Sequence, residues 1–480
     1  MPPLGRPERS TTIQLPPRVA TIAGEPDVLI VGGGPAGLGA AIGAARAGAD
    51  VVLVERYGFL GGNATASLVM PLMSFHNEVR AAREVDSDAE VRIMPTDHGP
   101  GEPVVAGPLK ELLDRLVRSG GAVKPSPATG YTVPFDPEQY KLAMLDMLDD
   151  AGVRYLFHAF ASGVADDAVV FETKTGPLAI PAAALVDCTG DGDVAAAAGA
   201  DFEIGREDDG LTQPMTLMFR MVEFDRGRFS DYVREHPDQW RGVNGLWDLV
   251  AKAAAAGQLD LPREDILFFA TPHEREVRVN STRTNPGPAI DVWALTAAEW
   301  ASRRQMREIV RFLREWVPGF EDAYAAQSGT VIGVRETRRV LGAYVLTGED
   351  VLEARAFDDA IARGSYPIDI HDPRGEGTVL KRLPPGSAYD IPLRCLIPRG
   401  TERLLVAGRC ISGTHEAHSS YRVTPIAMAT GHAAGVCAAL AARGGCPPRQ
   451  VTHTDVQREL LNQGASLRPE LATKASGHSP

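Results

Sequence analysis

The stretch from Asp27 to Glu55 constrains the fold of this chain more than any other. Two short apolar runs enclose an Ala-rich stretch of helical length: Val28–Val31 and Val51–Val54. Apolar runs of this kind predict strands that are buried on both faces of a parallel sheet. The glycines between the first run and the helix have the spacing GxGxxG. The order of strand, glycine turn, helix and strand predicts a dinucleotide-binding βαβ unit.

Each residue of this fingerprint has a physical role. Gly32 makes the tight turn, Gly34 lets the backbone approach a pyrophosphate, and Gly37 lets helix and strand pack closely. The helix N-terminus presents unpaired N–H groups to the phosphate. Glu55 follows Gly37 by 18 residues, near the usual separation of about 20, where an acid accepts hydrogen bonds from ribose hydroxyls. The stretch alone leaves open whether the dinucleotide is NAD or FAD.

Length and charge narrow the class of protein. A chain of 480 residues exceeds one ordinary core, so we expect two serial or interleaved domains. The net charge of −13 disfavours nucleic acid and anionic membranes as partners. We find no signal-peptide pattern, and no uninterrupted apolar run reaches the length of about 18 residues that a membrane-spanning helix needs. The sequence therefore predicts a soluble cytoplasmic protein.

The cysteines favour the same compartment. There are five of them, widely spaced and without a CxxC pair: Cys188, Cys395, Cys410, Cys437 and Cys446. This pattern argues against a disulfide framework and against a clustered-cysteine iron–sulfur site. The acids of DCTGDGD, which begins at Asp187, lack the following Glu of a calcium loop, so we interpret this segment as a tight turn and expect no metal.

Later segments bear on the choice between NAD and FAD. The pair Gly61-Gly62 follows the ribose acid closely and suits a loop that passes its backbone near an extended cofactor, although a simple surface turn remains the alternative. Two further buried strands are predicted: one begins at Leu185 and ends in the small-residue turn of DCTGDGD, and the other, Leu404–Gly408, ends at glycine. An extended FAD needs such additional contacts and NAD does not.

Several helices are marked by their ends. Gly107–Gly120 is amphipathic, and Asp136 followed by Pro137 predicts an N-cap and a first helical residue. The capping box Thr296–Glu299 predicts the start of a long helix. Near the C-terminus, Thr424 is the expected N-cap of a helix rich in Ala and Gly, which can pack closely against something flat.

With these motifs in view, the chain resembles the FAD-dependent oxidoreductases of the glutathione-reductase (GR2-like) type, in particular a poorly characterised bacterial branch. The matching stretches, over roughly residues 25–445, are VNSTR, GVRETRRVLGAYVLTGEDV, YPIDIH, IPLRCLIPRG and LLVAGRCIS…HEAHSSYRVTPIAMATGHAAG. The resemblance implies an α/β fold, with a Rossmann-like FAD-binding domain (a parallel sheet with a β-meander) and an interleaved α+β substrate domain. Some related proteins are heterodisulfide-reductase subunits with iron–sulfur clusters, which this chain lacks the cysteines to hold.

We expect seven segments along the chain. The FAD-binding domain is formed by residues 25–76, 131–200 and 391–445. Residues 77–130 form an insertion or lid, and residues 201–390 form the substrate or cap domain. Residues 1–24 and 446–480 are expected to be terminal tails.

The resemblance also implies which residues hold a non-covalent FAD. They are Gly32, Gly34, Pro35, Ala36, Gly37, Glu55, Arg56, Gly61, Gly62, Asn63, Thr189, Gly190, Asp191, Gly408, Arg409, Pro425 and Ile426. The helix that starts at Pro425 is expected to point its N-terminus at the pyrimidine edge of the flavin, where a reduced flavin carries negative charge.

Candidate residues for the chemistry follow from position and residue type. His415 and His418 lie between an FAD-binding strand and the helix that faces the flavin, and histidine serves as acid or base near neutral pH. The alternative for each is a structural hydrogen bond to a carbonyl group. Arg422 is expected to clamp a substrate carboxylate or to support the loop.

Four further residues are candidates for the substrate side: His76, Arg335, Asp369 and His371. His76 lines the pocket or, less expectedly, tethers the flavin covalently. Salt bridges within the protein are the alternative for Arg335. Asp369 and His371 are two residues apart, which places them on one side of an extended segment.

The sequence thus predicts an FAD-dependent oxidoreductase that transfers a hydride between a small organic substrate and flavin N5. The expected partners are a small-molecule substrate and an unidentified electron donor or acceptor, with a homo-oligomer as an option. Two alternatives stay open: an FAD-binding electron-transfer subunit without its own substrate site, and an NAD-linked enzyme that uses only the first βαβ unit.

Overall fold

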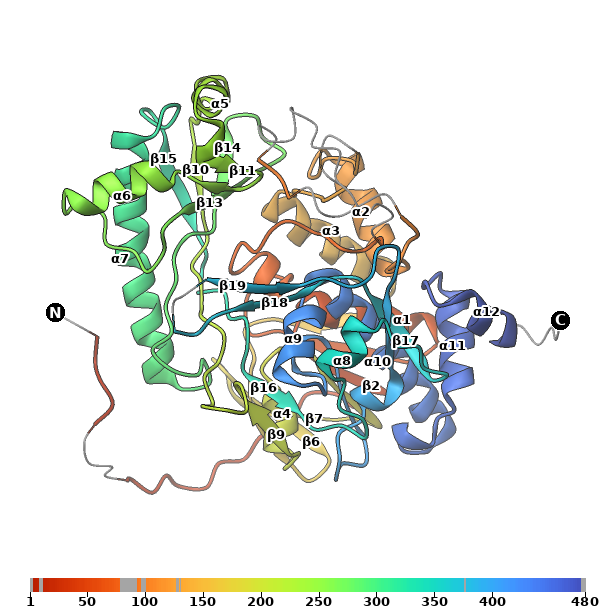
Figure 1. Ribbon diagram of the computed structural model, residues 1–480. Helices are drawn as coiled ribbons and strands as arrows, with labels where there is room; N and C mark the ends of the chain where they lie inside the picture. The colour runs from red at the N-terminus through yellow and green to blue at the C-terminus, as the bar shows by residue number, and fades with distance from the viewer. Residues whose placement is uncertain are drawn as a thin grey trace.

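The computed structural model describes residues 3–7, 12–77, 93–95, 101–126, 129, 131–374 and 377–475. Figure 1 shows a body built around a parallel sheet and, beside it, a lobe formed by the middle of the chain. Of residues 77–130, predicted as an insertion or lid, residues 78–92, 96–100, 127, 128 and 130 lie outside the described residues.

The parallel sheet has the strand order β21-β8-β2-β3-β4. Its strands are β2 (Val28–Val31), β3 (Val51–Val54), β4 (Arg154–Leu156), β8 (Ala184–Asp187) and β21 (Leu404–Val406). All neighbours are parallel, and every residue of β2, β3, β8 and β21 is buried. Continuous apolar runs form such strands because helices or loops cover both faces of the sheet. The predicted α/β fold with its βαβ unit is confirmed.

Two helices rich in Ala and Gly pack against each other beside this sheet: α1 (Pro35–Arg46) and α10 (Thr424–Gly444). A Cβ atom on Gly431 would lie 2.0 Å from the Ala36 carbonyl oxygen, and one on Gly435 would lie 2.0 Å from that of Ala40. The two backbones therefore touch directly. The sequence correctly predicts close packing for α10, but the partner of its small residues is α1.

Helix α10 is also the one helix in the described part of the chain that is long and apolar enough to cross a membrane. Its most apolar window is 83% buried inside the protein. It is therefore accounted for as a core helix.

The rest of the body covers this centre. A second sheet has the order β1-β7-β6-β5. Its strands are β1 (Thr21–Ile22), β5 (Phe160–Ala165), β6 (Ala168–Thr173) and β7 (Gly176–Pro181). Two of the three runs predicted as meander strands, at 168–174 and 178–181, form β6 and β7, whereas the third, at 153–158, forms β4 of the parallel sheet. The remaining helices of the body are α2 (Pro108–Arg118), α3 (Pro137–Asp150), α4 (Asp193–Ala197), α8 (Gly348–Leu352), α9 (His415–Tyr421), α11 (His453–Asn462) and α12 (Pro469–Ala475). Asp136 caps α3 as predicted, since its carboxylate accepts from the N–H groups of Glu138 and Gln139.

Part of the segment predicted as a C-terminal tail packs onto the body. Helix α11 contacts α10 and buries Val456 and Leu460 completely. These two residues are four apart in DVQRELL, so they lie on one helical face. This short amphipathic pattern is easily overlooked in a polar segment.

The lobe is built on a sheet in the order β11-β12-β13-β14-β10-β15. Its strands are β10 (Phe219–Val222), β11 (Trp240–Arg241), β12 (Asn244–Gly245), β13 (Ile266–Ala270), β14 (Glu276–Val279) and β15 (Tyr324–Ser328), and its helices are α5 (Arg226–Glu235), α6 (Trp247–Ala255) and α7 (Val292–Trp316). Aromatic rings form much of its core, including Phe224, Phe229, Trp240 and Phe268.

The start of α7 differs from the prediction. Asp291 is the N-cap, because its carboxylate accepts from the N–H of Trp293. Thr296, the predicted cap, lies inside the helix, and its hydroxyl donates to the carbonyl of Val292. The capping-box pattern at Thr296–Glu299 is therefore wrong as a helix start, since a Ser or Thr in a helix makes this backbone bond equally well.

Three two-stranded ribbons complete the structure: β9 (Phe202–Ile204) with β16 (Arg338–Val340), β17 (Ala360–Gly364) with β20 (Tyr389–Pro392), and β18 (Ile368–His371) with β19 (Thr378–Lys381). Helix α9 packs against β18. This contact brings residues near the C-terminal end of α9 beside Asp369 and His371.

Candidate active site

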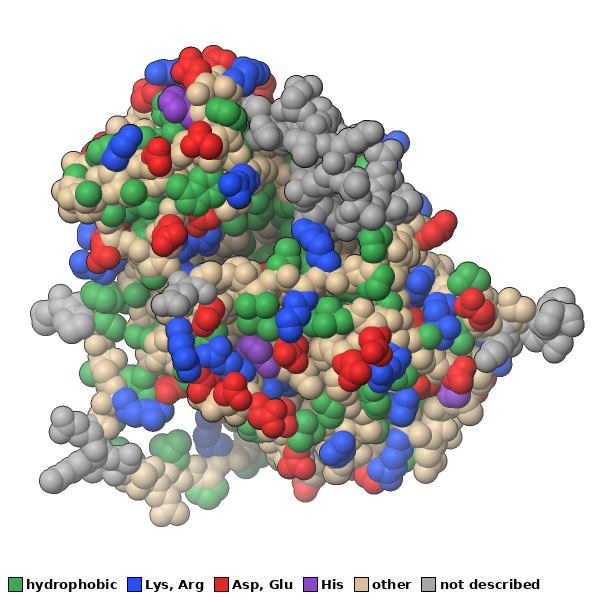
Figure 2. Space-filling model, viewed as in Figure 1, with side chains coloured by type: hydrophobic (Ala, Val, Ile, Leu, Met, Phe, Trp, Pro, Cys, Tyr) green, Lys and Arg blue, Asp and Glu red, His purple; other side chains and the backbone are tan. Residues whose placement is uncertain are grey.

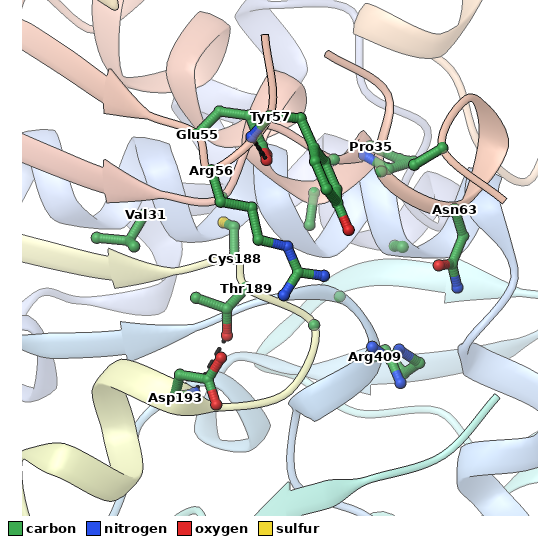
Figure 3. Close-up of a pocket in the computed structure, with 18 of the residues that line it drawn as sticks. Val31, Pro35, Glu55, Arg56, Tyr57, Asn63, Cys188, Thr189, Asp193 and Arg409 are labelled. Carbon is green, nitrogen blue, oxygen red and sulfur yellow. Dashed lines mark hydrogen bonds between the residues drawn. The ribbon is translucent and has the colours of Figure 1, made fainter. Parts of the chain in front are cut away.

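An open cavity lies at the carboxyl ends of β2, β3, β8 and β21. It is lined by Val31, Gly32, Gly34, Pro35, Ala36, Val54, Glu55, Arg56, Tyr57, Gly62, Asn63, Ala66, Ala159, Phe160, Ala161, Cys188, Thr189, Gly190, Asp193, Val331, Ala407, Gly408, Arg409, Arg422, Thr424 and Ala427. Figure 3 shows part of this lining. In sequence order the strands proceed outward from β2 in both directions, so the cavity lies where the strand order reverses. This is where open α/β sheets bind their ligands.

The glycines of the fingerprint do different things. A Cβ atom on Gly32 would lie 2.4 Å from the Cys188 carbonyl oxygen, and one on Gly37 would lie 1.9 Å from that of Gly32. Both are therefore required by the packing of the protein itself. A Cβ on Gly34 would meet nothing closer than 3.7 Å, although this residue lines the cavity. Packing does not require glycine at position 34, so its small size is explained by close approach of a ligand.

The N-terminus of α1 opens into the cavity. Gly34 is its N-cap, and no side chain caps the first turn. Gly34, Pro35 and Ala36 all line the cavity. The unpaired N–H groups and the positive end of the helix dipole at this position suit a phosphate group.

Glu55 occupies the end of β3 on the same side. Its carboxylate accepts from the backbone N–H of Gly33 at 2.6 Å and from that of Tyr57 at 2.9 Å. Burial raises the pKa of Glu55, while these two N–H groups act in the opposite direction. A carboxylate oxygen accepts more than one hydrogen bond. Glu55 is therefore held in place and retains acceptor capacity for ribose hydroxyls.

Two arginines bring positive charge to the cavity. The side chain of Arg56 extends from the end of β3 into the space above Thr189, and Arg409 lies opposite (Figure 3). Asp191 holds Arg409 at 2.7 Å from Nη2 and accepts from the Thr337 hydroxyl at 2.9 Å. The Nη1 atom of Arg409 is buried and has no hydrogen-bond partner in the described part of the chain. An unpaired buried cationic donor beside a helix N-terminus fits an anionic group such as a pyrophosphate.

Most of the residues predicted to hold FAD surround this one cavity. Among those that do not line it, Gly37 and Gly61 are in contact with the protein's own atoms, and Asp191 acts by holding Arg409. Pro425 and Ile426 are buried away from it, because α10 begins one residue earlier than predicted, with Val423 as N-cap. Thr424 and Ala427 take their place in the lining.

Sequence reasoning missed other lining residues. Tyr57, Phe160 and Ala161 reach the cavity from the segment after β3 and from β5. Val331 and Ala66 reach it together, since the N–H of Val331 donates to the Ala66 carbonyl. These residues have no motif of their own. Their place in the cavity lining becomes apparent only from the tertiary arrangement of the strands.

The cavity lining also includes Arg422, which follows α9. The guanidinium of Arg422 lies 3.6 Å from the Asp369 carboxylate, and the Tyr366 hydroxyl donates to the same carboxylate at 2.8 Å. His371 Nε2 lies 3.5 Å from Asp369. Arg335 is part of the same cluster, because its charge acts on His371 and Asp369 acts on Arg335. Three of the predicted substrate-side residues thus lie together with Arg422.

Burial and charge set the protonation of this cluster. Burial alone would raise the pKa of Asp369, but His371 and Arg422 hold it well below its usual value. Burial, followed by the charge of Arg335, lowers the pKa of His371 to about 4. The side chain of His371 nevertheless keeps 21% of its surface exposed. At neutral pH it is an accessible, uncharged imidazole.

The two predicted catalytic histidines lie behind the cavity. Neither His415 nor His418 lines it. His415 Nδ1 is 2.9 Å from the Glu336 carboxylate, which also accepts from Arg339 and from the backbone N–H of Gln213. His415 thus belongs to a buried hydrogen-bond network, in which its partner is a carboxylate and not the carbonyl group of the structural alternative.

His418 is fully buried and packs edge-on against Tyr421. Burial, helped by the charges of Arg339 and Arg422, lowers its pKa well below the ordinary value. Neither of its ring nitrogens has a hydrogen-bond partner in the protein. Its side chain is not among the groups that line the cavity.

His76 is also separate from the cavity lining. Its ring packs against Phe75 at a centroid distance of 4.8 Å, and its carbonyl accepts from the Ser365 hydroxyl. Burial lowers the pKa of His76. Within the described residues, no group of three or more His, Cys, Asp or Glu side chains is arranged to hold a metal ion.

The chain can also be compared with known protein families and solved structures. The family model described as FAD dependent oxidoreductase matches residues 27–460. No curated protein sequence matches the chain.

Solved structures show similarity at low identity. A geranylgeranyl bacteriochlorophyll reductase-like protein from Thermoplasma acidophilum is 13% identical, with 94% of this chain and 82% of that chain covered and a TM-score of 0.41. For p-nitrophenol 4-monooxygenase from Pseudomonas putida these values are 11%, 96%, 84% and 0.40. For a flavin-dependent brominase they are 11%, 91%, 84% and 0.43. At this level of similarity no inference about substrate follows.

Proposed function

Because this chain belongs to the FAD-dependent oxidoreductase family, we propose that it transfers a hydride between a small organic substrate and N5 of FAD. Bound FAD accepts or donates the electron pair, and the protein supplies binding, orientation and proton handling. The observation that carries the proposal is the single cavity that extends from Glu55, at the end of β3, to Arg422 and Thr424, at the start of α10.

The two ends of this cavity suit the two ends of FAD. Glu55 supports the adenosine ribose, and the first turn of α1 with Arg409 supports the pyrophosphate. Thr424 and Ala427 bring the first turn of α10 into the same lining, and we expect the flavin ring beside this turn. Helix N-terminal N–H groups there stabilise negative charge. We assign FAD as non-covalently bound, since His76 lies outside the cavity lining.

Proton handling belongs to His371 in this proposal. Oxidation of an alcohol or amine by hydride loss releases one further proton, and a neutral imidazole accepts it. His371, like His415 and His418, is not among the residues that line the cavity. It is favoured because its side chain is 21% exposed and lies 3.5 Å from Asp369, beside Arg422, which does line the cavity, whereas His418 is fully buried. We therefore place His371 in the role that the sequence suggests for His415 and His418, and we retain Arg422 as the catalytic-site arginine.

Other parts of the assignment rest on the sequence. We propose that the chain is of the glutathione-reductase type and cytoplasmic, that its electron donor or acceptor is a separate molecule, and that a homo-oligomer is compatible with it. The FAD-binding domain is proposed to comprise residues 25–76, 131–200 and 391–445, with residues 201–390 as the substrate domain. The absence of paired cysteines in the sequence makes the electron-transfer subunit the less favoured function.

A glycine substitution tests the proposal. Gly34 has a φ of −77° that any residue adopts, and a Cβ atom there would be at ordinary contact distance from the protein, 3.7 Å from the Gly62 Cα, on the side of the cavity. Gly34→Val should therefore leave the protein folded but abolish FAD binding. Gly163→Val is a matched control, because Gly163 has open space around it within the sheet that contains β5. The measurement is flavin absorbance per mole of purified protein.

The outcomes separate the alternatives. Wild-type protein that binds no FAD refutes the proposal, as does full FAD occupancy in Gly34→Val. If FAD is bound but no reductant or metabolite from a broad panel changes its absorbance under anaerobic conditions, the electron-transfer subunit becomes the better assignment.

A further inference from the structure

The cluster at the Arg422 end of the cavity contains more hydrogen-bond donors than acceptors. The Nε atom of Arg422 and the Nε2 atom of Gln213 are both buried and lack hydrogen-bond partners among the described residues. The side chains are neighbours, with Gln213 Oε1 at 3.5 Å from Arg422 Nη2. Buried donors without acceptors are costly, so native proteins retain them mainly where a ligand or water satisfies them.

Arg335 adds a third set of donors to this cluster. Its Nη1 atom is anchored twice, to the Pro214 carbonyl at 2.6 Å and to the Thr216 hydroxyl at 2.7 Å. No described residue accepts a hydrogen bond from its Nε or Nη2. The side chain is only partly buried. Arg335 is thus fixed at one corner of its guanidinium and presents the free Nε–Nη2 edge, which is the edge that binds a carboxylate with two parallel hydrogen bonds.

The charges in the cluster also favour an anionic ligand. Arg335 and Arg422 share one carboxylate, Asp369, and His371 is uncharged at neutral pH. Burial and then the charge of Arg422 lower the pKa of Arg335 to about 9. Arg263 and Arg283 are more remote from this pair: Arg263 is paired with Asp265, and Arg283 donates to the Asp372 carbonyl. The Arg335–Arg422 pair therefore carries a positive charge that no described side chain balances.

The cluster adjoins the cavity proposed for FAD. Arg422 lines that cavity, and Asn63, which also lines it, donates to the carbonyl of Val334, the residue before Arg335. The space-filling view shows a hollow between the lobe and the body (Figure 2). A molecule held by Arg335 and Arg422 would therefore lie beside the flavin end of the cavity.

We propose that the substrate is a carboxylic acid whose carboxylate is bound by the free edge of Arg335 together with Arg422 and Gln213. This inference rests on the proposed function and names its substrate class. Asp369 acts as a positioning residue, because it fixes Arg422 and His371 but, as a carboxylate, does not bind an anionic ligand.

The test is ligand binding to the FAD-loaded protein. Short monocarboxylates, dicarboxylates, 2-hydroxy acids and aromatic acids are titrated and read by calorimetry and by shifts of the flavin spectrum, each beside its neutral amide. At least one acid should bind and its amide should not. Arg335→Met should weaken binding by about tenfold to a hundredfold, the loss expected for a bidentate charge-assisted pair. Arg335→Lys keeps the charge without the planar edge, so it should fall between.

Arg307→Met, at an exposed position on α7, is the matched control and should bind acids as the wild type does. FAD content and the unfolding midpoint are measured for every variant, so a folding defect is recognised separately.

Several results would overturn the inference: no acid binds; inorganic phosphate binds more tightly than every acid; or Arg335→Met binds acids unchanged. Acid binding to the FAD-free protein that disappears on FAD loading would mean that the cluster holds FAD itself. Failure of the proposed function gives a different result, namely that the protein does not bind FAD at all.

Discussion

The contact between α1 and α10 provides a quantitative prediction. A Cβ atom at position 431 would lie 2.0 Å from the Ala36 carbonyl oxygen, and ordinary contact begins at 3.4 Å. Gly431→Ala therefore forces the two helices apart locally by about 1.4 Å, and overpacking of this kind costs about 1–3 kcal/mol or more. The higher helix propensity of Ala returns at most about 1 kcal/mol. We expect a net loss of about 1–2 kcal/mol in the free energy of unfolding.

The matched control is Gly444→Ala at the end of the same helix. A Cβ there meets only the flexible Cys446 side chain, at 3.3 Å. This variant should gain up to about 0.5–1 kcal/mol. The assay is urea unfolding of all three proteins with saturating FAD, followed by FAD titration, since Ala36 lines the cavity and its displacement should also weaken FAD binding. If Gly431→Ala is as stable as Gly444→Ala, the direct backbone contact between the helices is refuted.

Two further predictions concern the surroundings of the cavity. Asp191→Asn should weaken FAD binding by about tenfold, because Asp191 fixes Arg409. Fluorescence titration measures the affinity for FAD, with Asp455→Asn on α11 as the control. Equal affinities of Asp191→Asn and wild type for FAD would contradict the assigned role. Because burial lowers the pKa of His418, the unfolded chain binds a proton below about pH 6.5 that the native state does not, so stability should fall as pH decreases through that range. His418→Phe should reduce the slope of the free energy of unfolding against pH by up to about 1.4 kcal/mol per pH unit. The control, His236→Gln, should leave this slope unchanged. Identical urea midpoints at every pH for His418→Phe and wild type would contradict the prediction.

Local patterns predicted the FAD-binding centre well because its strands are short, apolar and buried on both faces. The βαβ unit, the strands that end at Asp187 and Val406, and the start of α3 at Asp136 all follow from sequence. The start of α7 was misplaced because Thr296 makes a hydrogen bond within the helix that resembles a cap. Local chemistry does not distinguish these two uses of threonine.

The candidate catalytic residues show the limit of such reasoning. His415 and His418 stand between two elements that border the cavity, but they lie on the part of α9 that faces the core. Arg335 has no motif that separates a structural role from ligand binding, and the difference depends on which of its nitrogens are anchored. That depends on Pro214 and Thr216, more than a hundred residues earlier in the chain.

The most direct test of the account is an experimental structure of the protein with FAD bound. The account predicts electron density for the adenosine beside Glu55, the pyrophosphate at the first turn of α1 with Arg409, and the flavin ring beside Thr424 and Arg422. Density in the reverse orientation, or FAD bound outside this cavity, would contradict it.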